Sequence, residues 1–317
     1  MTPNRKPIVV VGSINMDLVT TAHRIPAAGE TVLGTSFQTH PGGKGANQAV
    51  AVARLGYPVQ MIGRLGTDAF GAELKAHLQE AGVDTGGIAE SDGSSGVAII
   101  VVSDEGQNII VVTPGANAKL TPQDIDANIE RIRDAGIVLT QLEIPMEAVE
   151  HLASVCAREG APLMLDPAPA AKLSPKILSN IQWLTPNQTE AEFYLKDGAA
   201  AHDGLDQAAI SQSLLSAGPR GVILKMGGDG VYLASQDGLR ASVPAFPVTA
   251  VDTTAAGDAF NGGFATALML GKTPAESARF ANAVAGISVT RPGAQASMPS
   301  MAEVEHLLAT KEKGTTA

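Results

Sequence analysis

Short apolar runs alternate with helical patterns along this chain, and this alternation constrains the fold more than any other feature. The runs at residues 8–11, 137–142, 163–165 and 222–225 are rich in Val, Ile and Leu, and a glycine or a carboxylate follows each of the first three. Continuous apolar runs of this length are typical of strands buried on both faces of a sheet. The alternation therefore predicts an α/β fold with a mostly parallel sheet, helices on both faces and ligands at the carboxyl ends of the strands.

The length and composition fit one large domain with a small excursion. The 317 residues are 44% hydrophobic and 17% charged, without an internal repeat or a low-complexity linker. We expect a single domain over residues 1–310 and a frayed tail over residues 311–317. Extended segments at about residues 14–40 and 95–112 contain strand and turn patterns, and they are predicted to form a small second sheet outside the main one.

The charge and the cysteine content restrict the partners. A net charge of −10 and only 3% aromatic residues argue against a nucleic-acid partner, which usually needs a basic surface and stacking residues. No apolar run approaches the roughly 20 residues that span a bilayer, so no membrane partner is expected. The single cysteine, Cys156, lies at helical spacing from apolar neighbours and is interpreted as a core residue. We expect a cytoplasmic protein.

Residues 251–260 form the most informative local stretch, because small residues there turn from a strand end into a helix. Free backbone N–H groups and the helix dipole make such a turn an anion site without any basic side chain. Asp258 would be repelled by a phosphate unless it faced a hydroxyl that attacks the phosphorus. An ordinary capped helix start is the alternative. A helix N-terminus should also make Asp258 a weaker base than usual.

Four further segments carry polar or glycine patterns. Asn15 and Asp17 project to one side of an extended segment and could grip a polyol, although an Asx turn is the alternative. The glycines that open residues 42–56 do not match a Walker A loop, because a glycine follows the lysine. Glu190 lies one turn after Asn187, which is also a capping pattern. The glycines at residues 226–230 indicate either a tight hairpin or a backbone shaped against phosphates.

Taken together, these motifs resemble the PfkB-type carbohydrate kinase family. The resemblance rests on residues 12–17, 42–49, 185–190, 252–261 and 289–295, in this order along the chain. It implies a three-layer α/β/α sandwich with a β lid over the sugar, and a homodimer in which the lids of two subunits pair. The segments 14–40 and 95–112 fit that lid.

The resemblance also implies a role for individual residues. The sugar would be held by Asn15, Asp17, Gly43, Lys44, Asn47, Glu143 and Asp258. Asp258 would be the catalytic base, beside an anion hole of Ala255, Ala256 and Gly257. ATP would contact Asn187, Lys225, Gly227, Gly228, Asp229, Gly230, Gly257 and Asn282. A monovalent cation, K⁺, would lie near Asp252, Thr254, Ser288, Arg291, Gly293 and Ser297, and Glu190 would order the water shell of Mg²⁺.

The expected reaction is the phosphorylation of D-ribose by MgATP at the 5-hydroxyl, because the charged and polar sugar pocket suits a small free polyhydroxy sugar. A family member acting on 2-deoxyribose, fructose, a sugar acid or a nucleoside is the alternative. A catalytically silent sugar sensor is a second class of function. A dinucleotide-dependent dehydrogenase shares the βαβ pattern, but no Gly-x-Gly-x-x-Gly follows the first strand.

Overall fold

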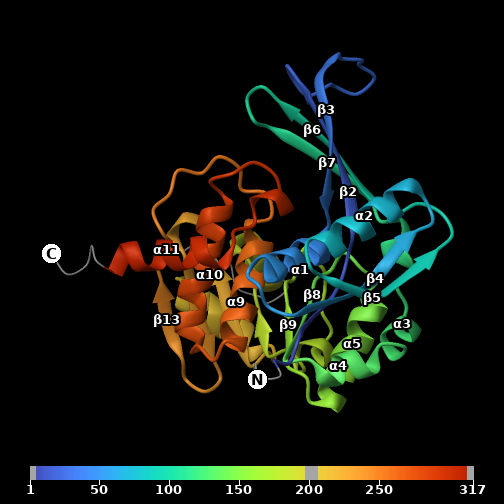
Figure 1. The fold of residues 1–317 in the computed structure, drawn as a ribbon. Helices are drawn as coiled ribbons and strands as arrows, with labels where there is room; N and C mark the ends of the chain where they lie inside the picture. Colours follow the sequence, from blue (N-terminus) through green and yellow to red (C-terminus); the bar gives the residue numbers. More distant parts are fainter. Residues whose placement is uncertain (1–4, 197–205, 313–317) are drawn as a thin grey trace.

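A nine-stranded sheet forms the centre of the molecule in a computed structural model that describes residues 5–196 and 206–312. The strand order is β13-β12-β11-β10-β9-β8-β1-β4-β5 (Figure 1). The pairs from β5 to β11 are parallel, and β12 and β13 are added antiparallel. The strands are β1 (Ile8–Val11), β4 (Val59–Gly66), β5 (Asp84–Ser91), β8 (Ile137–Thr140), β9 (Leu163–Leu165), β10 (Trp183–Leu184), β11 (Gly221–Lys225), β12 (Val231–Ser235) and β13 (Arg240–Val243).

Helices cover both faces of this sheet, as the apolar runs predict. Along β1, Ile8 and Val10 enter one apolar core whereas Val9 and Val11 enter the other, because successive side chains of a strand point to opposite faces. The first core packs against α1 (Lys44–Arg54), α2 (Ala69–Glu80), α9 (Ala256–Met269), α10 (Pro274–Ser288) and α11 (Met301–Glu312). The second packs against α3 (Pro122–Asp126), α4 (Ile129–Asp134), α5 (Met146–Glu159), α6 (Pro175–Leu178), α7 (Gln188–Lys196) and α8 (Gln207–Ser216). The three-layer α/β/α architecture is confirmed.

A second, four-stranded sheet stands away from the main body (Figure 1). Its order is β3-β2-β6-β7, with β2 (Asn15–Ala22), β3 (Gly34–Gly42), β6 (Gly96–Ser103) and β7 (Asn108–Thr113). These strands coincide with the two segments predicted for the small sheet, except that β3 continues to Gly42 and β7 to Thr113. Strands β6 and β7 form the expected antiparallel hairpin. We call this sheet the lid. Because β2 follows β1 after three residues, the lid starts directly from the central strand of the main sheet.

Helices α1 and α9 pack closely because of one glycine. A Cβ atom on Gly262 of α9 would lie 2.7 Å from the Cβ of Ala51 on α1, which is closer than two carbon atoms approach. Only a residue without a side chain allows the two helix backbones to come this near. The N-terminal turns of α1 and α9 thereby meet beside the carboxyl ends of β1 and β9, where a ligand site is expected in a parallel sheet.

Four smaller expectations, on the helix after Thr121, Cys156, the C-terminal tail and membrane-spanning segments, can be compared with the structure. The helix expected to run on from Thr121 is divided into α3 and α4, with Thr121 and Asp124 forming a capping box at the start of α3. Cys156 is buried, and burial raises the pKa of its thiol to about 12. Helix α11 continues to Glu312, and the rest of the predicted tail lies outside the described residues. Within residues 5–196 and 206–312, no helix has the length and apolar character needed to cross a bilayer.

Candidate functional site

The backbone at the start of α9 has the geometry of an anion site. The residue before the helix, Ala255, has φ 57°, and it is the only non-glycine residue of positive φ in the described chain. Such conformations are strained and cluster at functional sites. The N–H of Ala256 donates to Thr253 O at 3.2 Å, whereas those of Gly257 and Asp258 have no acceptor among the described residues. Of the three predicted anion-hole residues, Ala255 and Gly257 therefore keep an N–H without an acceptor among the described residues, whereas Ala256 does not. No side chain caps the helix.

Asp258 is buried in the first turn of α9, only 4% exposed, and two amide side chains of α1 hold it. The Nδ2 of Asn47 donates to its Oδ2 at 3.0 Å, and the Nε2 of Gln48 donates to its Oδ1 at 3.0 Å. The close contact of α1 with α9 makes both bonds possible. Asn47 is itself held by Gln295, whose Nε2 donates to Asn47 Oδ1 at 3.1 Å.

The expectation that Asp258 is a weaker base than usual is wrong. Burial raises the pKa of its carboxyl to about 6, with a contribution in the same direction from Asp166, although Lys44 and the two amide donors lower it. Removing a carboxylate from water outweighs the dipole of the helix, because desolvation disfavours the charged form directly. A carboxyl group with this pKa is suited to accept a proton near neutral pH.

The predicted sugar residues lie together around Asp258. Asn15 begins β2 opposite Gly42 of β3, and the next residue, Gly43, has φ 85° and approaches the Asn15 backbone so closely that a Cβ atom would lie 2.7 Å from its nitrogen. Sequence reasoning missed Asn117, which donates from Nδ2 to Asn15 Oδ1 at 2.7 Å. Nothing local identifies Asn117, because it enters from a separate 3-10 helix, Gly115–Lys119.

The pocket holds several carboxylates around one ammonium group, that of Lys44. Burial, together with the nearby charges of Glu143 and Asp258, raises the pKa of Asp17 to about 7. Glu143 accepts from Ser13 Oγ at 2.5 Å and from the Lys44 N–H at 3.1 Å. Burial would lower the pKa of the Lys44 ammonium, but the surrounding carboxylates raise it above its usual value: Asp258, Asp166, Glu143 and Glu190. Lys44 is thus the central cation of an acidic cluster.

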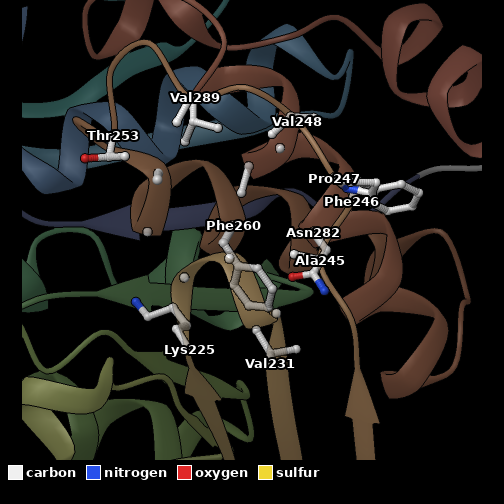
Figure 2. A pocket seen from close by; sticks show the side chains of 18 residues that line it. Lys225, Val231, Ala245, Phe246, Pro247, Val248, Thr253, Phe260, Asn282 and Val289 are labelled. Carbon is white, nitrogen blue, oxygen red and sulfur yellow. The ribbon is translucent and has the colours of Figure 1, made fainter.

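A cavity of about 340 Å³ opens beside the start of α9 (Figure 2). Six of the predicted nucleotide residues line it: Lys225, Gly227, Gly228, Gly230, Gly257 and Asn282. The turn of residues 227–230 links the antiparallel strands β11 and β12, so the glycines form a tight hairpin whose backbone also faces the cavity. A Cβ atom on Gly257 would lie 3.3 Å from Lys225 Nζ, which places this ammonium against the anion site.

The far wall of this cavity was not predicted. In Figure 2, Lys225 lies at one end, and Phe246 and Pro247 lie at the other. The amide of Asn282 donates from Nδ2 to Val243 O and Pro244 O, both at 3.0 Å, and so anchors the loop that carries them. The segment 244–250 has no motif in the sequence. Its apolar side chains, together with Val231 and Phe260, suit a flat aromatic ring.

Two predicted nucleotide residues, Asn187 and Asp229, do not line the cavity. Asp229 is exposed in the turn after β11. Asn187 pairs with Lys225 in a bridge and forms a reciprocal cap with Glu190: its Nδ2 donates to Glu190 Oε1 at 3.0 Å, and its Oδ1 accepts the Glu190 N–H at 2.8 Å. Asn187 and Glu190 therefore form the helix cap that their spacing also predicts. It does not remove Glu190 from the site, because Glu190 is among the carboxylates that act on Lys44.

Asp252 joins the loop before α9 to the turn near residue 293. Its Oδ1 accepts the Thr254 N–H at 2.9 Å, and its Oδ2 accepts the Gly293 N–H at 2.8 Å. Ser288 and Ser297 donate from their hydroxyls to backbone carbonyls, and Arg291 pairs with Glu303 of α11. Asp252 thus joins two of the other predicted cation residues, Thr254 and Gly293, whereas the side chains of Ser288, Arg291 and Ser297 bond to other partners.

Comparisons with known proteins agree with this geometry. A family model described as pfkB family carbohydrate kinase matches residues 5–301. The ribokinase of Bacillus subtilis (strain 168) is 43% identical over 302 residues, which are 95% of this chain and 99% of that protein. A crystal structure of ribokinase from Thermotoga maritima superposes with a TM-score of 0.89 at 39% identity, over 96% of this chain and 99% of that one. The Arabidopsis thaliana ribokinase complexed with ribose and ATP gives a TM-score of 0.88 at 36% identity, with 96% and 98% covered.

The buried carboxyl groups should take up protons at unusually high pH. We expect titration steps near pH 7 and pH 6 in the ligand-free protein, because Asp17 and Asp258 have raised pKa values of about 7 and about 6. The base form of Asp258 then dominates above about pH 6 and is lost below it. Carbon-13 NMR of protein labelled at aspartate carboxyls measures both steps, and Asp258→Asn should remove one of them. Two steps near pH 4 would contradict the assignment.

Proposed function

The chain belongs to the pfkB family of carbohydrate kinases, and we propose that it transfers the γ-phosphoryl group of ATP to the 5-hydroxyl of D-ribose. The observation that carries this proposal is the position of Asp258, a buried carboxylate with a raised pKa between a polar pocket and a backbone anion site. The similar Arabidopsis protein was solved with ribose and ATP. The products would be ADP and ribose 5-phosphate.

The chemistry proposed for the site is an in-line displacement. The oxygen of the sugar 5-hydroxyl forms a bond to the γ-phosphorus while the bond from this phosphorus to the β,γ-bridging oxygen breaks. Asp258 accepts the proton that the hydroxyl loses. The free N–H groups of Gly257 and Asp258 face the charge on the equatorial oxygens, which dominates the loose transition state of phosphoryl transfer. The Lys225 ammonium, 2.9 Å from Asp166 and next to Gly257, adds positive charge on the nucleotide side.

Ribose is proposed as the acceptor because the pocket is dense in polar groups. Asn15, Asp17 and Glu143 offer acceptors, and Lys44 and Asn47 offer donors, which suits neighbouring hydroxyls better than an apolar nucleobase. Bound 2-deoxyribose would lack the 2-hydroxyl that one of these groups would contact, and a buried polar side chain would be left unpaired. The chain's own pocket chemistry therefore favours the 2-hydroxyl sugar.

The described residues fit Mg²⁺ as a companion of the nucleotide. Within residues 5–196 and 206–312, no three carboxylate, histidine or cysteine side chains are placed so that they could hold a metal ion by themselves, and Mg²⁺ bound with ATP takes most of its ligands from phosphates and water. Glu190, near Lys44 and Lys225, is the proposed contact to that water shell. When bound, Mg²⁺ would neutralise part of the phosphate charge.

A monovalent cation, K⁺, is proposed beside Asp252. Burial alone would raise the pKa of the Asp252 carboxylate, but the Thr254 side chain and the N–H donors of Thr254 and Gly293 outweigh it and lower the pKa. The negative charge lies within the loop that leads to Ala255. The proposed ligands are Asp252 and oxygen atoms around Thr254, Ser288, Arg291, Gly293 and Ser297, so a cation there would fix the loop that shapes the anion site.

A homodimer through the lid is also proposed. Every residue of β7 is exposed, including Ile110 at 53% and Val111 at 59%, and Phe37 of β3 is 65% exposed. An edge strand with apolar side chains on both faces is a surface that proteins usually cover. A second copy of the same sheet would cover it by packing lid against lid, with matching apolar surfaces on both copies.

The substrate and the base can be tested together. We expect ADP release with ribose to exceed that with 2-deoxyribose, fructose or inosine, and Asp258→Asn to lower kcat by at least ~10² to 10⁴, the usual loss when a general base is removed. Ribose binding by the variant, measured by calorimetry, serves as the folding control. Equal turnover of ribose and 2-deoxyribose would count against ribose, and a near-normal kcat would remove Asp258 from its role. Ribose binding without turnover by the unaltered protein would instead indicate a sensor.

The cation proposal predicts a salt effect. Replacing tetramethylammonium with K⁺ at constant ionic strength should raise kcat, because the bulky organic ion cannot enter the loop. In Asp252→Asn the response to K⁺ should weaken, since the carboxylate charge is lost. Rates that are the same in both salts would eliminate the cation from the mechanism.

The lid proposal predicts the oligomeric state. Analytical ultracentrifugation should show a dimer, and the double change Ile110→Asp and Val112→Asp should shift it to a monomer, because buried carboxylates at the interface are costly. Leu270→Asp, an exposed apolar residue at the end of α9, is the matched control and should leave the dimer intact. A monomeric unaltered protein would refute this arrangement.

A further inference from the structure

Two glutamines without an assigned role are buried behind Asp258. Gln48 on α1 is 1% exposed, and Gln141, directly after β8, is 0% exposed. Gln48 Nε2 donates to Asp258 Oδ1 at 3.0 Å and to Asp166 Oδ2 at 3.3 Å. Gln141 Nε2 donates to Gln48 Oε1 at 2.7 Å. A single amide group thus bridges two buried carboxylates, and a second amide holds the first.

The orientation of both amides follows from the carboxylates. Ionised Asp258 and Asp166 only accept hydrogen bonds, so Gln48 must turn its NH₂ group toward them, and this group has two hydrogens to give. Its carbonyl oxygen then faces away and needs a donor, which Gln141 supplies from its own NH₂ group. If either amide were rotated by half a turn, an oxygen would face an oxygen. The charge on the two aspartates therefore determines the direction of the whole chain of bonds.

We propose that Gln48 and Gln141 are positioning residues for Asp258, an inference that rests on the kinase function proposed above. Gln48 keeps the carboxylate ionised and in one rotamer through a direct bond. Gln141 contacts neither substrate nor base and acts only through Gln48. Asn47 holds the other oxygen, Asp258 Oδ2, but it also belongs to the proposed sugar pocket, whereas the two glutamines serve the base alone.

Gln141 is fixed by the end of the main sheet. A Cβ atom on Gly12, just after β1, would lie 2.1 Å from Gln141 Oε1, so this glycine leaves the space that the amide occupies. The Oε1 atom has no hydrogen-bond partner among the described residues. Packing against Gly12, together with the bond to Gln48, therefore holds the side chain in place. The position of Asp258 is therefore tied, through Gln48 and Gln141, to the carboxyl ends of β1 and β8.

Several charged groups face Asp258, and Gln48 lies between Asp258 and one of them, Asp166. Lys44 of α1 stabilises its ionised form, and Asp166 after β9 opposes it. Asp17 of β2 interacts with Asp258, and Glu143 after β8 acts on both Asp17 and Lys44. Lys225 pairs with Asp166 at 2.9 Å on the side away from Gln48. Without the Gln48 donors, two like charges would face each other directly, which raises the pKa of one of them.

The first test replaces Gln48 with an apolar side chain of similar shape. When kcat is measured against pH, its fall on the acidic side, here called the acidic limb, reports protonation of Asp258. In Gln48→Met this limb should move to higher pH by about one to two units, the change expected when a carboxylate loses a hydrogen-bond donor. At pH 7, kcat should fall by about tenfold to hundredfold, as for a misplaced catalytic group. The dissociation constant of ribose should stay the same. A purely structural defect would instead lower kcat at every pH without moving the limb.

The second test asks whether the two residues act in series. Gln141→Met should shift the same limb in the same direction but less far, and the double variant should match Gln48→Met alone. Independent contributions would multiply instead, which a double-mutant cycle distinguishes. Gln60→Met is the matched control: Gln60 lies on β4, has a buried Oε1 without a partner in the described chain and makes no contact with the site. It should behave like the unaltered protein.

A measurement without turnover separates this inference from the proposed reaction. Carbon-13 NMR of ligand-free protein should show the Asp258 titration step at higher pH in Gln48→Met than in the unaltered protein or in Gln60→Met. If the unaltered protein does not phosphorylate ribose, the proposed function fails while this comparison still stands. An unchanged titration step and an unchanged kcat limb in a folded Gln48→Met variant would overturn the positioning role.

Discussion

Burial of the Asp258 carboxylate is the constraint on which the site depends. A charge removed from water must be compensated by partners close by, and here the partners come from elements far apart in the chain. The amides of Asn47 and Gln48 approach from α1, and the Lys44 ammonium lies near. Because α1 can supply all three only by packing against α9, the close contact at Gly262 is a requirement of the chemistry as much as of the fold.

The sequence predicted the architecture well because its signals are local and periodic. Apolar runs that end at a glycine or a carboxylate identified β1, β8 and β9, and the small second sheet followed from strand and turn patterns. Six of the eight predicted nucleotide residues line one cavity, and the predicted sugar residues Asn47 and Asp17 interact with Asp258. Each of these predictions needed only a strand end, a glycine or a helix start, which neighbours in the sequence determine.

The remaining features depend on contacts that no local pattern records. Asn117 reaches Asn15 across 102 positions of the sequence, and the bond from Gln48 to Asp258 spans 210 positions. The loop that carries Phe246 forms a cavity wall without any motif. The base strength of Asp258 was predicted in the wrong direction, because the helix dipole is visible in the sequence whereas burial and the neighbouring Asp166 are known only from packing.

Two different parts of the fold, the α1–α9 helix pair and the lid strand β2, supply the sugar pocket, and this has a consequence for how related proteins change their acceptor. Lys44 and Asn47 belong to the rigid pair of α1 and α9, but Asn15 and Asp17 begin a strand that continues into the lid. The part that recognises the acceptor is therefore separable from the part that carries the base. Substitutions in β2 can alter which hydroxyls are accepted while the anion-binding backbone and the support of Asp258 remain intact. One scaffold can in this way acquire new acceptors without rebuilding its reaction centre.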